Sequence, residues 1–241
     1  MADLTLRVLH VDTQCLALDK PAGVLSVPGR SDDLVQEEAL SQRVRSMEPQ
    51  ALPVHRLDRG TSGVLLFAIG RDAHRALNQV FESRKAEKRY VALVRGDFKL
   101  PQVCKLPLAE TRRGGMRIAE NNEKGAMPCE TEFKIRERFG AFSLVEARPM
   151  TGRTHQIRVH LAALGHPLLF DARYGDATPV LARELNPGTG TPDEVVLTRT
   201  PLHAEALRVP HPNGKGWLSV ESPLPADLSR ALDLLRAARR G

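Results

Sequence analysis

The chain has 241 residues, 41% of them hydrophobic and 27% charged, and its formal net charge is +6. This composition excludes an intrinsically disordered chain, and the positive charge favours a polyanionic partner. Three widely separated cysteines, Cys15, Cys104 and Cys129, exclude a disulfide scaffold, and no apolar run reaches the roughly 18–20 residues of a membrane helix. We therefore expect a cytoplasmic monomer with no membrane partner.

Hydrophobic periodicity in the first 96 residues predicts strands and helices in mixed order. The expected elements are two short strands within 4–19, a helix over 31–47 with Ser31 as its N-cap, a strand over 64–68, a helix over 72–84 and a strand over 89–96. Such mixed order is typical of one α+β domain, here over 1–241.

The second part of the chain is less regular. We expect an irregular basic segment over 100–125, a hairpin over 133–147, a helix that begins at Thr151 or Thr154 and ends at Gly165, and a last helix around 228–235. Proline, glycine and threonine are frequent in 176–200, which predicts an exposed, flexible loop.

The stretch H-R-L-D-R-G-T-S-G over 55–63 places polar residues between a turn and an apolar strand. Asp58 lies between Arg56 and Arg59, and a nearby guanidinium favours the ionised carboxylate. An ionised carboxylate can act as a nucleophile. An ordinary loop with a surface ion pair has the same residues, so these residues alone leave both interpretations open.

The stretch T-G-R-T-H-Q-I-R-V-H over 151–160 predicts a turn that enters a helix. Backbone N–H groups at the start of a helix can hold a phosphate, and Arg153 can add a bidentate contact. Arg158, one turn further along, can reach inward to a carboxylate. The alternative is a polar helix face over an apolar core. The histidine spacing matches no metal motif, so we expect no metal.

Tyr90 lies in the stretch K-R-Y-V-A-L-V-R-G over 88–96, on an expected strand and next to cationic residues. A tyrosine in this setting can stack on a flipped base. A half-buried structural tyrosine is the alternative. The chain has two tyrosines and one tryptophan, which is too few for an extended stacking platform for single-stranded RNA.

Together these stretches resemble the RluA family of RNA pseudouridine synthases. The resemblance runs in order along nearly the whole chain, through 19–23, 55–63, 89–96, 151–160, 165–167 and 202–204. It implies an α+β fold with a long mixed, mainly antiparallel sheet, flanking helices and a central basic cleft. A leucine and phenylalanine precede Asp171 where relatives usually have a glycine, which puts the local turn in doubt.

The resemblance also implies residue roles. Asp58 matches the catalytic aspartate, Tyr90 the tyrosine that stacks on the target uracil, and Arg158 the arginine that pairs with the aspartate. Arg56 matches a residue that holds the flipped-out strand. The remaining RNA-binding candidates are Arg153, His155 and Arg30.

The implied reaction isomerises a uridine in structured RNA, with Asp58 attacking either C6 of the uracil or C1′ of the ribose and with no cofactor. The start of the chain indicates no S4 RNA-binding domain and is similar to the branch that modifies 23S rRNA and the tRNA anticodon stem-loop. A tRNA acceptor-stem site or another rRNA uridine is the alternative substrate.

Two other classes fit the residues less well. An aspartate-nucleophile phosphatase would need D-x-D-x-T, but Gly60 stands at the position of the second aspartate. A non-catalytic RNA-binding module would not need Asp58, Tyr90 and Arg158 together.

Overall fold

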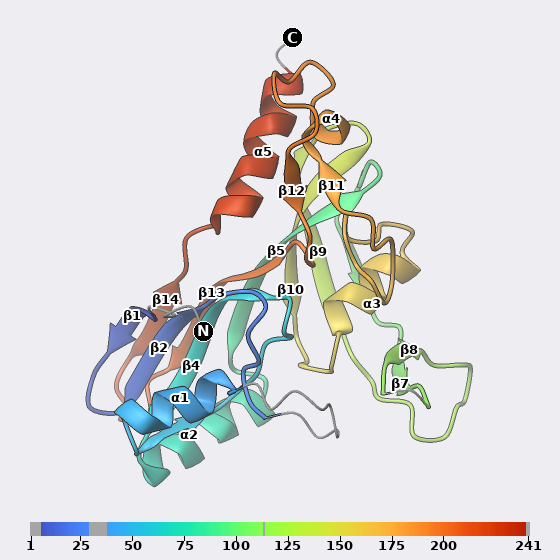
Figure 1. The fold of residues 1–241 in the computed structure, drawn as a ribbon. Helices are drawn as coiled ribbons and strands as arrows, with labels where there is room; N and C mark the ends of the chain where they lie inside the picture. The colour runs from blue at the N-terminus through green and yellow to red at the C-terminus, as the bar shows by residue number, and fades with distance from the viewer. Residues whose placement is uncertain (1–5, 29–37, 113, 240–241) are drawn as a thin grey trace. The chain divides into compact units, whose positions relative to one another are not determined.

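The computed structural model describes residues 6–28, 38–112 and 114–239, which Figure 1 draws in colour. The chain divides into two compact units. Unit 1 consists of 1–88 and 204–223, and unit 2 consists of 89–203 and 224–241. No helix in the described ranges combines the length and the apolar character that a bilayer-spanning segment needs.

Unit 1 is built on antiparallel strands. The elements are β1 (Arg7–Val11), β2 (Cys15–Lys20), β3 (Ala51–Pro53), β4 (Ser62–Ile69), β14 (Trp217–Glu221) and the part of β13 (Leu202–Pro210) from Ala204 onward. β2 pairs with β1 and β4, β3 pairs with β4, and β13 pairs with β14, all antiparallel. The strands predicted within 4–19 and over 64–68 are confirmed.

Helix α2 (Arg71–Glu82) covers one face of β4. Its Ala73 and Leu77 share a buried cluster with Val64, Leu66 and Ala68 of that strand. These three strand residues alternate with Leu65 and Phe67, which are buried on the opposite face. The predicted helix over 72–84 is confirmed within two residues at each end.

Helix α1 (Leu40–Met47) is shorter than the predicted helix, and Ser31 is not its N-cap. The helix begins after Ala39, whose N–H donates to Oε1 of Gln42 at 2.9 Å. The N–H groups of Leu40 and Ser41 donate to the carbonyls of Leu25 and Ser26 at 2.8 and 3.1 Å, so the first turn has acceptors without a hydroxyl cap. Ser31 itself lies outside the described residues.

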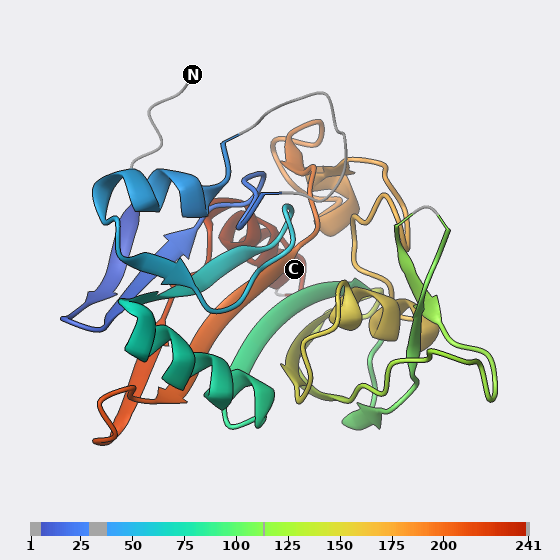
Figure 2. The ribbon, with the colours of Figure 1, turned by 90° about the horizontal axis from the view of Figure 1, so that it is seen from below.

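Unit 2 has a four-stranded antiparallel arrangement with a helix on each face (Figures 1 and 2). The strands follow the order β5 (Glu87–Arg95), β10 (Phe142–Pro149), β9 (Thr131–Arg138) and β6 (Gln102–Cys104). Helix α5 (Ala226–Ala238) packs with Val91 and Leu93, whereas α3 (Gln156–Ala163) packs with Ala92 and Val94. The predicted strand over 89–96, the hairpin and both helices are confirmed.

Two predictions about loops are wrong. The segment 100–125 contains β6, β7 (Leu108–Glu110) and β8 (Met116–Ile118), each too short to show alternation. The segment 176–200 contains β11 (Val180–Leu181), α4 (Ala182–Leu185) and β12 (Val195–Leu197). The apolar residues of β11, α4 and β12 pack against α5. The glycines and prolines of 176–200 therefore mark a turn between packed elements rather than one exposed loop.

Gly63 shows why the S-G step at the start of β4 requires a glycine in this chain. Its φ is +115°, and a Cβ added there would lie 2.2 Å from the carbonyl oxygen of Ala204. Real Cβ atoms do not approach backbone so closely, so β4 and β13 could not keep this spacing with any other residue at 63.

We expect Gly63→Ala to destabilise the protein by about 2–4 kcal/mol, because overpacking and a left-handed backbone act together. Urea unfolding of the full chain measures the change. Gly214→Ala is the matched control, since its φ is +76° but nothing lies within 4 Å of the added Cβ. Equal losses in the two variants would show that the approach to Ala204 contributes nothing.

Candidate active site

Asp58 lies in unit 1, on the loop between β3 and β4, and its neighbour Leu57 is fixed by a buried serine. Ser26 Oγ donates to the Leu57 carbonyl at 2.9 Å and accepts the Leu57 N–H at 3.0 Å. The N–H of Thr61 donates to the Asp58 carbonyl at 3.0 Å, which closes a turn. The backbone on both sides of the carboxylate is therefore held by short hydrogen bonds.

Lys20 is fully buried beneath the same loop. Its ammonium donates to the carbonyls of Pro21 at 2.9 Å, Val24 at 2.7 Å and Arg59 at 3.3 Å. Arg59 and Gly23 also pair with each other, because the Gly23 N–H donates to the Arg59 carbonyl and Arg59 Nε donates to the Gly23 carbonyl. A buried cation must find acceptors, and here it joins the D-K-P-A-G turn to the Asp58 loop.

His55 is a structural anchor of this loop. Its Nε2 accepts the N–H of Leu66 at 3.0 Å, and its ring stacks on Phe81 with a centroid distance of 5.1 Å. Burial lowers the pKa of His55 to about 3, with a further contribution from the charge of Lys88, so the ring is neutral at pH 7. A neutral Nε2 is the form that can accept the hydrogen bond.

Tyr90 and Arg158 lie in unit 2. Tyr90 is on β5, opposite Ala147 of β10, and its ring packs partly against the buried cluster that includes Ile157 and Leu161 of α3. Arg158 is on α3 between the buried residues Ile157 and Val159. The strand and helix that the sequence predicts for these two residues are confirmed.

Arg158 forms a bidentate, buried ion pair with Asp171. Its Nε donates to Oδ2 at 2.8 Å and its Nη2 donates to Oδ1 at 2.7 Å. The two side chains are 10% and 1% exposed. Burial alone would raise the pKa of Asp171, but the hydrogen bonds and charge of Arg158 and the N–H groups of Arg173 and Tyr174 lower it below its usual value. The prediction that Arg158 reaches a carboxylate is thus confirmed for Asp171.

Tyr174 connects this ion pair to His155. The ring lies 5.0 Å from Cζ of Arg158, and the hydroxyl is 2.7 Å from Nδ1 of His155 and accepts the N–H of Met116 at 3.0 Å. The turn at Asp171 closes normally despite Phe170, because Oδ1 of Asp171 also accepts the N–H groups of Arg173 and Tyr174. Phe170 therefore does not prevent the turn at Asp171.

The start of α3 differs from the prediction. Neither Thr151 nor Thr154 caps the helix; the residue before it is His155, in the left-handed region with φ +54°. Thr151 donates instead to Oε1 of Gln156 at 2.7 Å, and the N–H of Arg153 donates to the same oxygen at 3.0 Å. That N–H is therefore occupied by the protein and is not available to a phosphate.

His160 closes a chain of buried hydrogen bonds from the same helix. Gln156 Nε2 donates to Oγ1 of Thr131, which lies 2.9 Å from Nδ1 of His160, and His160 Nε2 lies 3.0 Å from the Leu106 carbonyl. Burial lowers the pKa of His160, so its ring is neutral. Much of the T-G-R-T-H-Q-I-R-V-H stretch thus anchors α3 rather than reaching toward a ligand.

The other RNA-binding candidates lie on the surface or outside the described residues. Arg56 and Arg153 are exposed, and His155 is half-buried beside Tyr174. Arg30 lies outside the described residues.

One group of side chains in the described ranges has the ligand types of a metal site, namely Asp12, Cys15 and His211 in unit 1. His10 and His211 each place Nε2 on Oδ2 of Asp12, at 2.7 and 3.0 Å. Nδ1 of His211 accepts the N–H of Asn213, so its proton lies on Nε2 and no lone pair remains there for a metal. The group ties the β1–β2 turn to the end of β13 by hydrogen bonds.

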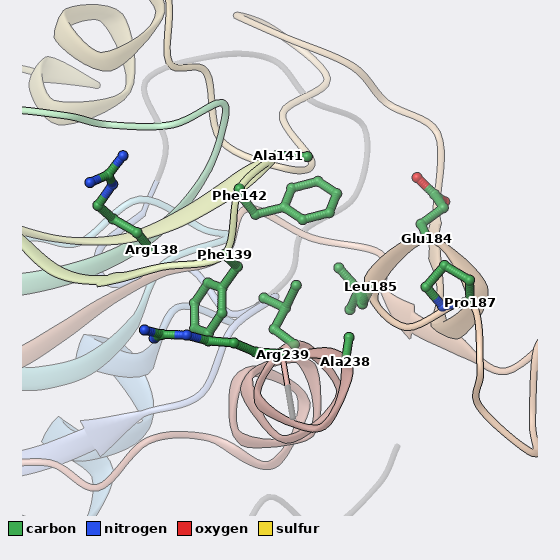
Figure 3. Close-up of a pocket in the computed structure, with 11 residues that line it drawn as sticks. Arg138, Phe139, Ala141, Phe142, Glu184, Leu185, Pro187, Ala238 and Arg239 are labelled. Carbon is green, nitrogen blue, oxygen red and sulfur yellow. The ribbon is translucent and has the colours of Figure 1, made fainter. Parts of the chain in front are cut away.

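A cavity of 340 Å³ in unit 2 is lined by the β9–β10 turn, α4 and the end of α5 (Figure 3). Phe139, Phe142 and Leu185 contribute to its wall. Glu184, on the rim, accepts the N–H of Leu181 at 3.0 Å. None of the residues that the sequence predicts for the site lines this cavity.

The sequence reasoning missed Asp171 and Tyr174 as partners of Arg158. One signal was available: an aspartate directly after the apolar run 168–170 is expected to be buried, and a buried carboxylate requires a cation. The aromatic contact of Tyr174 had no comparable signal, because no spacing rule connects 158 with 174.

The chain is similar to known proteins over most of its length. Residues 14–163 match the family model described as RNA pseudouridylate synthase. Ribosomal large subunit pseudouridine synthase C of Escherichia coli is 40% identical over 238 residues, which cover 96% of this chain and 70% of that protein. The protein of the same name from Vibrio parahaemolyticus is 36% identical over 241 residues, which cover 99% and 72%.

Two solved structures share the fold. Human RNA Pseudouridylate Synthase Domain Containing 1 has a TM-score of 0.70 and 27% identity, covering 97% of this chain and 95% of that chain. Human RNA Pseudouridylate Synthase Domain Containing 4 has a TM-score of 0.74, 24% identity and coverages of 95% and 93%, which supports the fold alone. The expected α+β class is confirmed.

We expect Asp171→Asn to destabilise the protein by about 3–5 kcal/mol at pH 7, because it removes a carboxylate that pairs with the buried charge of Arg158. The folded-state pKa of Asp171 is lowered, so its contribution to stability is present above the unfolded pKa of about 4 and is lost as pH falls through the folded pKa. Urea unfolding from pH 7 to pH 3 therefore shows a smaller loss of stability in the variant than in the wild type.

Asp97→Asn is the control for this experiment. Asp97 pairs with Arg138 at the surface of unit 2, where solvent screens the charges. The account of the buried pair is contradicted if Asp171→Asn is no more destabilising than Asp97→Asn.

Proposed function

Because the chain belongs to the RNA pseudouridylate synthase family, we propose that it converts uridine to pseudouridine in ribosomal RNA with Asp58 as the nucleophile. The activity is that of an isomerase. The observation that carries the assignment of Asp58 is its position in the H-R-L-D stretch, on a loop that Ser26 and Lys20 hold in place.

The chemistry of the reaction needs no net oxidation and no group donor. Asp58 attacks either C6 of the uracil or C1′ of the ribose, and the N1–C1′ bond breaks. The base rotates, C5 bonds to C1′, and the bond to Asp58 breaks. A proton leaves C5, and N1 gains a proton. Substrate and product contain the same atoms, which is the basis for proposing that the reaction uses no cofactor.

Fixed backbone around Asp58 supports its role. A nucleophile must meet its target atom within a few tenths of an ångström, and a loop that had to order itself first would add to the barrier. Hydrogen bonds at Leu57, Arg59 and Thr61 restrict the loop on both sides of Asp58. The carboxylate can thus be placed before RNA arrives.

We assign to Tyr90 the role of stacking on the target uracil, and to Arg158 the role of pairing with the charged Asp58 carboxylate. Tyr90 sits on a strand rather than a loop, so its ring is presented by rigid backbone. Arg158 is directed by its bidentate pair with Asp171, and a guanidinium has five N–H donors, so two bonds to Asp171 leave others for a second acceptor.

We assign Arg56, Arg153, His155 and Arg30 to contacts with the RNA backbone. The side chains of Arg56 and Arg153 are exposed, as a phosphate contact requires, and the chain carries a net charge of +6. His155 is half-buried and has its orientation set by Tyr174.

Large-subunit ribosomal RNA is the substrate we propose. Relatives from two bacteria that align with nearly all of this chain are named as ribosomal large subunit pseudouridine synthases. The tRNA anticodon stem-loop and acceptor stem remain predictions from the sequence resemblance. A cytoplasmic location fits three buried, unpaired cysteines.

Asp58→Asn tests the central residue with little change in shape. We expect release of tritium from large-subunit rRNA transcripts labelled with [5-³H]uridine to fall by about 10³-fold or more, while the dissociation constant for the RNA changes by less than about threefold. Asp72→Asn, on the exposed side of α2, is the control and should retain the wild-type rate. Wild-type tritium release by Asp58→Asn would refute the assignment.

The phosphate contacts predict a salt dependence. Arg153→Gln should weaken RNA binding and lower the slope of log Kd against log salt concentration by about 1, because one counterion fewer is released. Filter binding at several salt concentrations measures the slope. Arg183→Gln, which removes an exposed arginine paired with Asp193, is the control, and an unchanged slope in Arg153→Gln would remove this residue from the interface.

A further inference from the structure

Tyr174 contacts both a catalytic candidate and an RNA-binding candidate in unit 2. Its ring lies under the guanidinium of Arg158, 5.0 Å from Cζ to the ring centroid, and its hydroxyl lies 2.7 Å from Nδ1 of His155. We propose that Tyr174 is a positioning residue of the reaction, in which the ring aims Arg158 and the hydroxyl aims His155. This inference rests on the proposed function.

Arg158 needs more than Asp171 to be fixed. The bidentate pair holds the guanidinium in the plane of the carboxylate, but such a pair does not itself oppose tilting about its own axis. An aromatic ring against the face of the guanidinium opposes that tilt and adds a favourable cation–π interaction. Tyr174 and Asp171 therefore restrain different motions of the same group.

Tyr174 is itself held from three sides. Its hydroxyl accepts the N–H of Met116 on β8, its own N–H donates to Oδ1 of Asp171 at 3.2 Å, and it packs partly against the buried cluster of Leu108, Met116, Cys129 and Val159. A side chain restrained in this way can pass on a fixed position to its neighbours.

His155 depends on the hydroxyl for a different reason. Its backbone is left-handed, with φ +54°, which is an unfavourable conformation for a residue with a Cβ. The hydrogen bond to Tyr174 and the edge-on contact of the two rings, 5.4 Å between centroids, hold the imidazole beside the start of α3. Ring and hydroxyl therefore act on different neighbours, and substitution can separate them.

Two variants separate the two effects. Tyr174→Phe keeps the ring and removes the hydroxyl, so we expect KM for [5-³H]uridine-labelled large-subunit rRNA to rise about fivefold while the single-turnover rate constant at saturating RNA stays within about twofold. Tyr174→Leu removes the ring as well, so we expect that rate constant to fall about tenfold or more.

A double-mutant cycle distinguishes positioning from loss of fold. If Tyr174 acts through Arg158, Tyr174→Leu combined with Arg158→Lys should be scarcely slower than Arg158→Lys alone. Phe98→Leu is the control, because Phe98 is a fully buried aromatic residue of unit 2 that contacts Phe133 and His166. It should lower the melting temperature at least as much as Tyr174→Leu and leave the rate constant unchanged well below that temperature.

Three results would overturn the inference: wild-type kinetics in both Tyr174 variants, fully additive losses in the cycle, or an equal loss of rate in Phe98→Leu. A wild-type chain that releases no tritium from any RNA would overturn the proposed function instead, so the two failures are distinguishable.

Discussion

The buried ion pair between Arg158 and Asp171 is the constraint on which the arrangement of unit 2 depends. Neither group could be buried alone, because an unpaired charge in that position costs several kcal/mol. Once paired, Asp171 also accepts the N–H groups of Arg173 and Tyr174 and so determines the turn that follows it. That turn brings Tyr174 to the guanidinium and to His155.

Unit 1 also contains a buried charge, but backbone carbonyls rather than a carboxylate are its partners. There a fully buried lysine, Lys20, donates to three carbonyls and joins two loops that lie 39 residues apart in sequence. Ser26 adds a pair of hydrogen bonds to Leu57. Buried polar groups thus help to hold the Asp58 loop in unit 1 and Arg158 of α3 in unit 2. Such groups are costly to leave unpaired, and they therefore specify one geometry.

The sequence predicts those parts of the fold that follow from periodicity. The strands around Val64 and Tyr90 and the helices that contain Ala73 and Leu232 are present as expected, because their apolar patterns repeat over enough residues to be distinctive. Strands of two or three residues, such as those at Leu108 and Val180, show no repeat. They form because tertiary packing favours them, and the sequence therefore predicts a loop over 176–200.

The sequence predicts only some of the residues of the candidate site. Asp58, Tyr90 and Arg158 are recognisable because their motifs are continuous in sequence. Asp171 and Tyr174 are not, because only folding creates their contacts with Arg158. Likewise, Gln156 and His160 belong to a motif that looks suited to a ligand, yet they bond to Thr131 and Leu106 inside the protein.

In this protein, buried polar groups hold the Asp58 loop and Arg158 in place without bound RNA. The most direct measurement is a map of pseudouridine in large-subunit rRNA from cells that lack this chain, compared with the same cells expressing the wild type or Asp58→Asn. The account predicts at least one pseudouridine that is absent without the chain, restored by the wild type and not restored by Asp58→Asn. Identical maps in all three cells would contradict it.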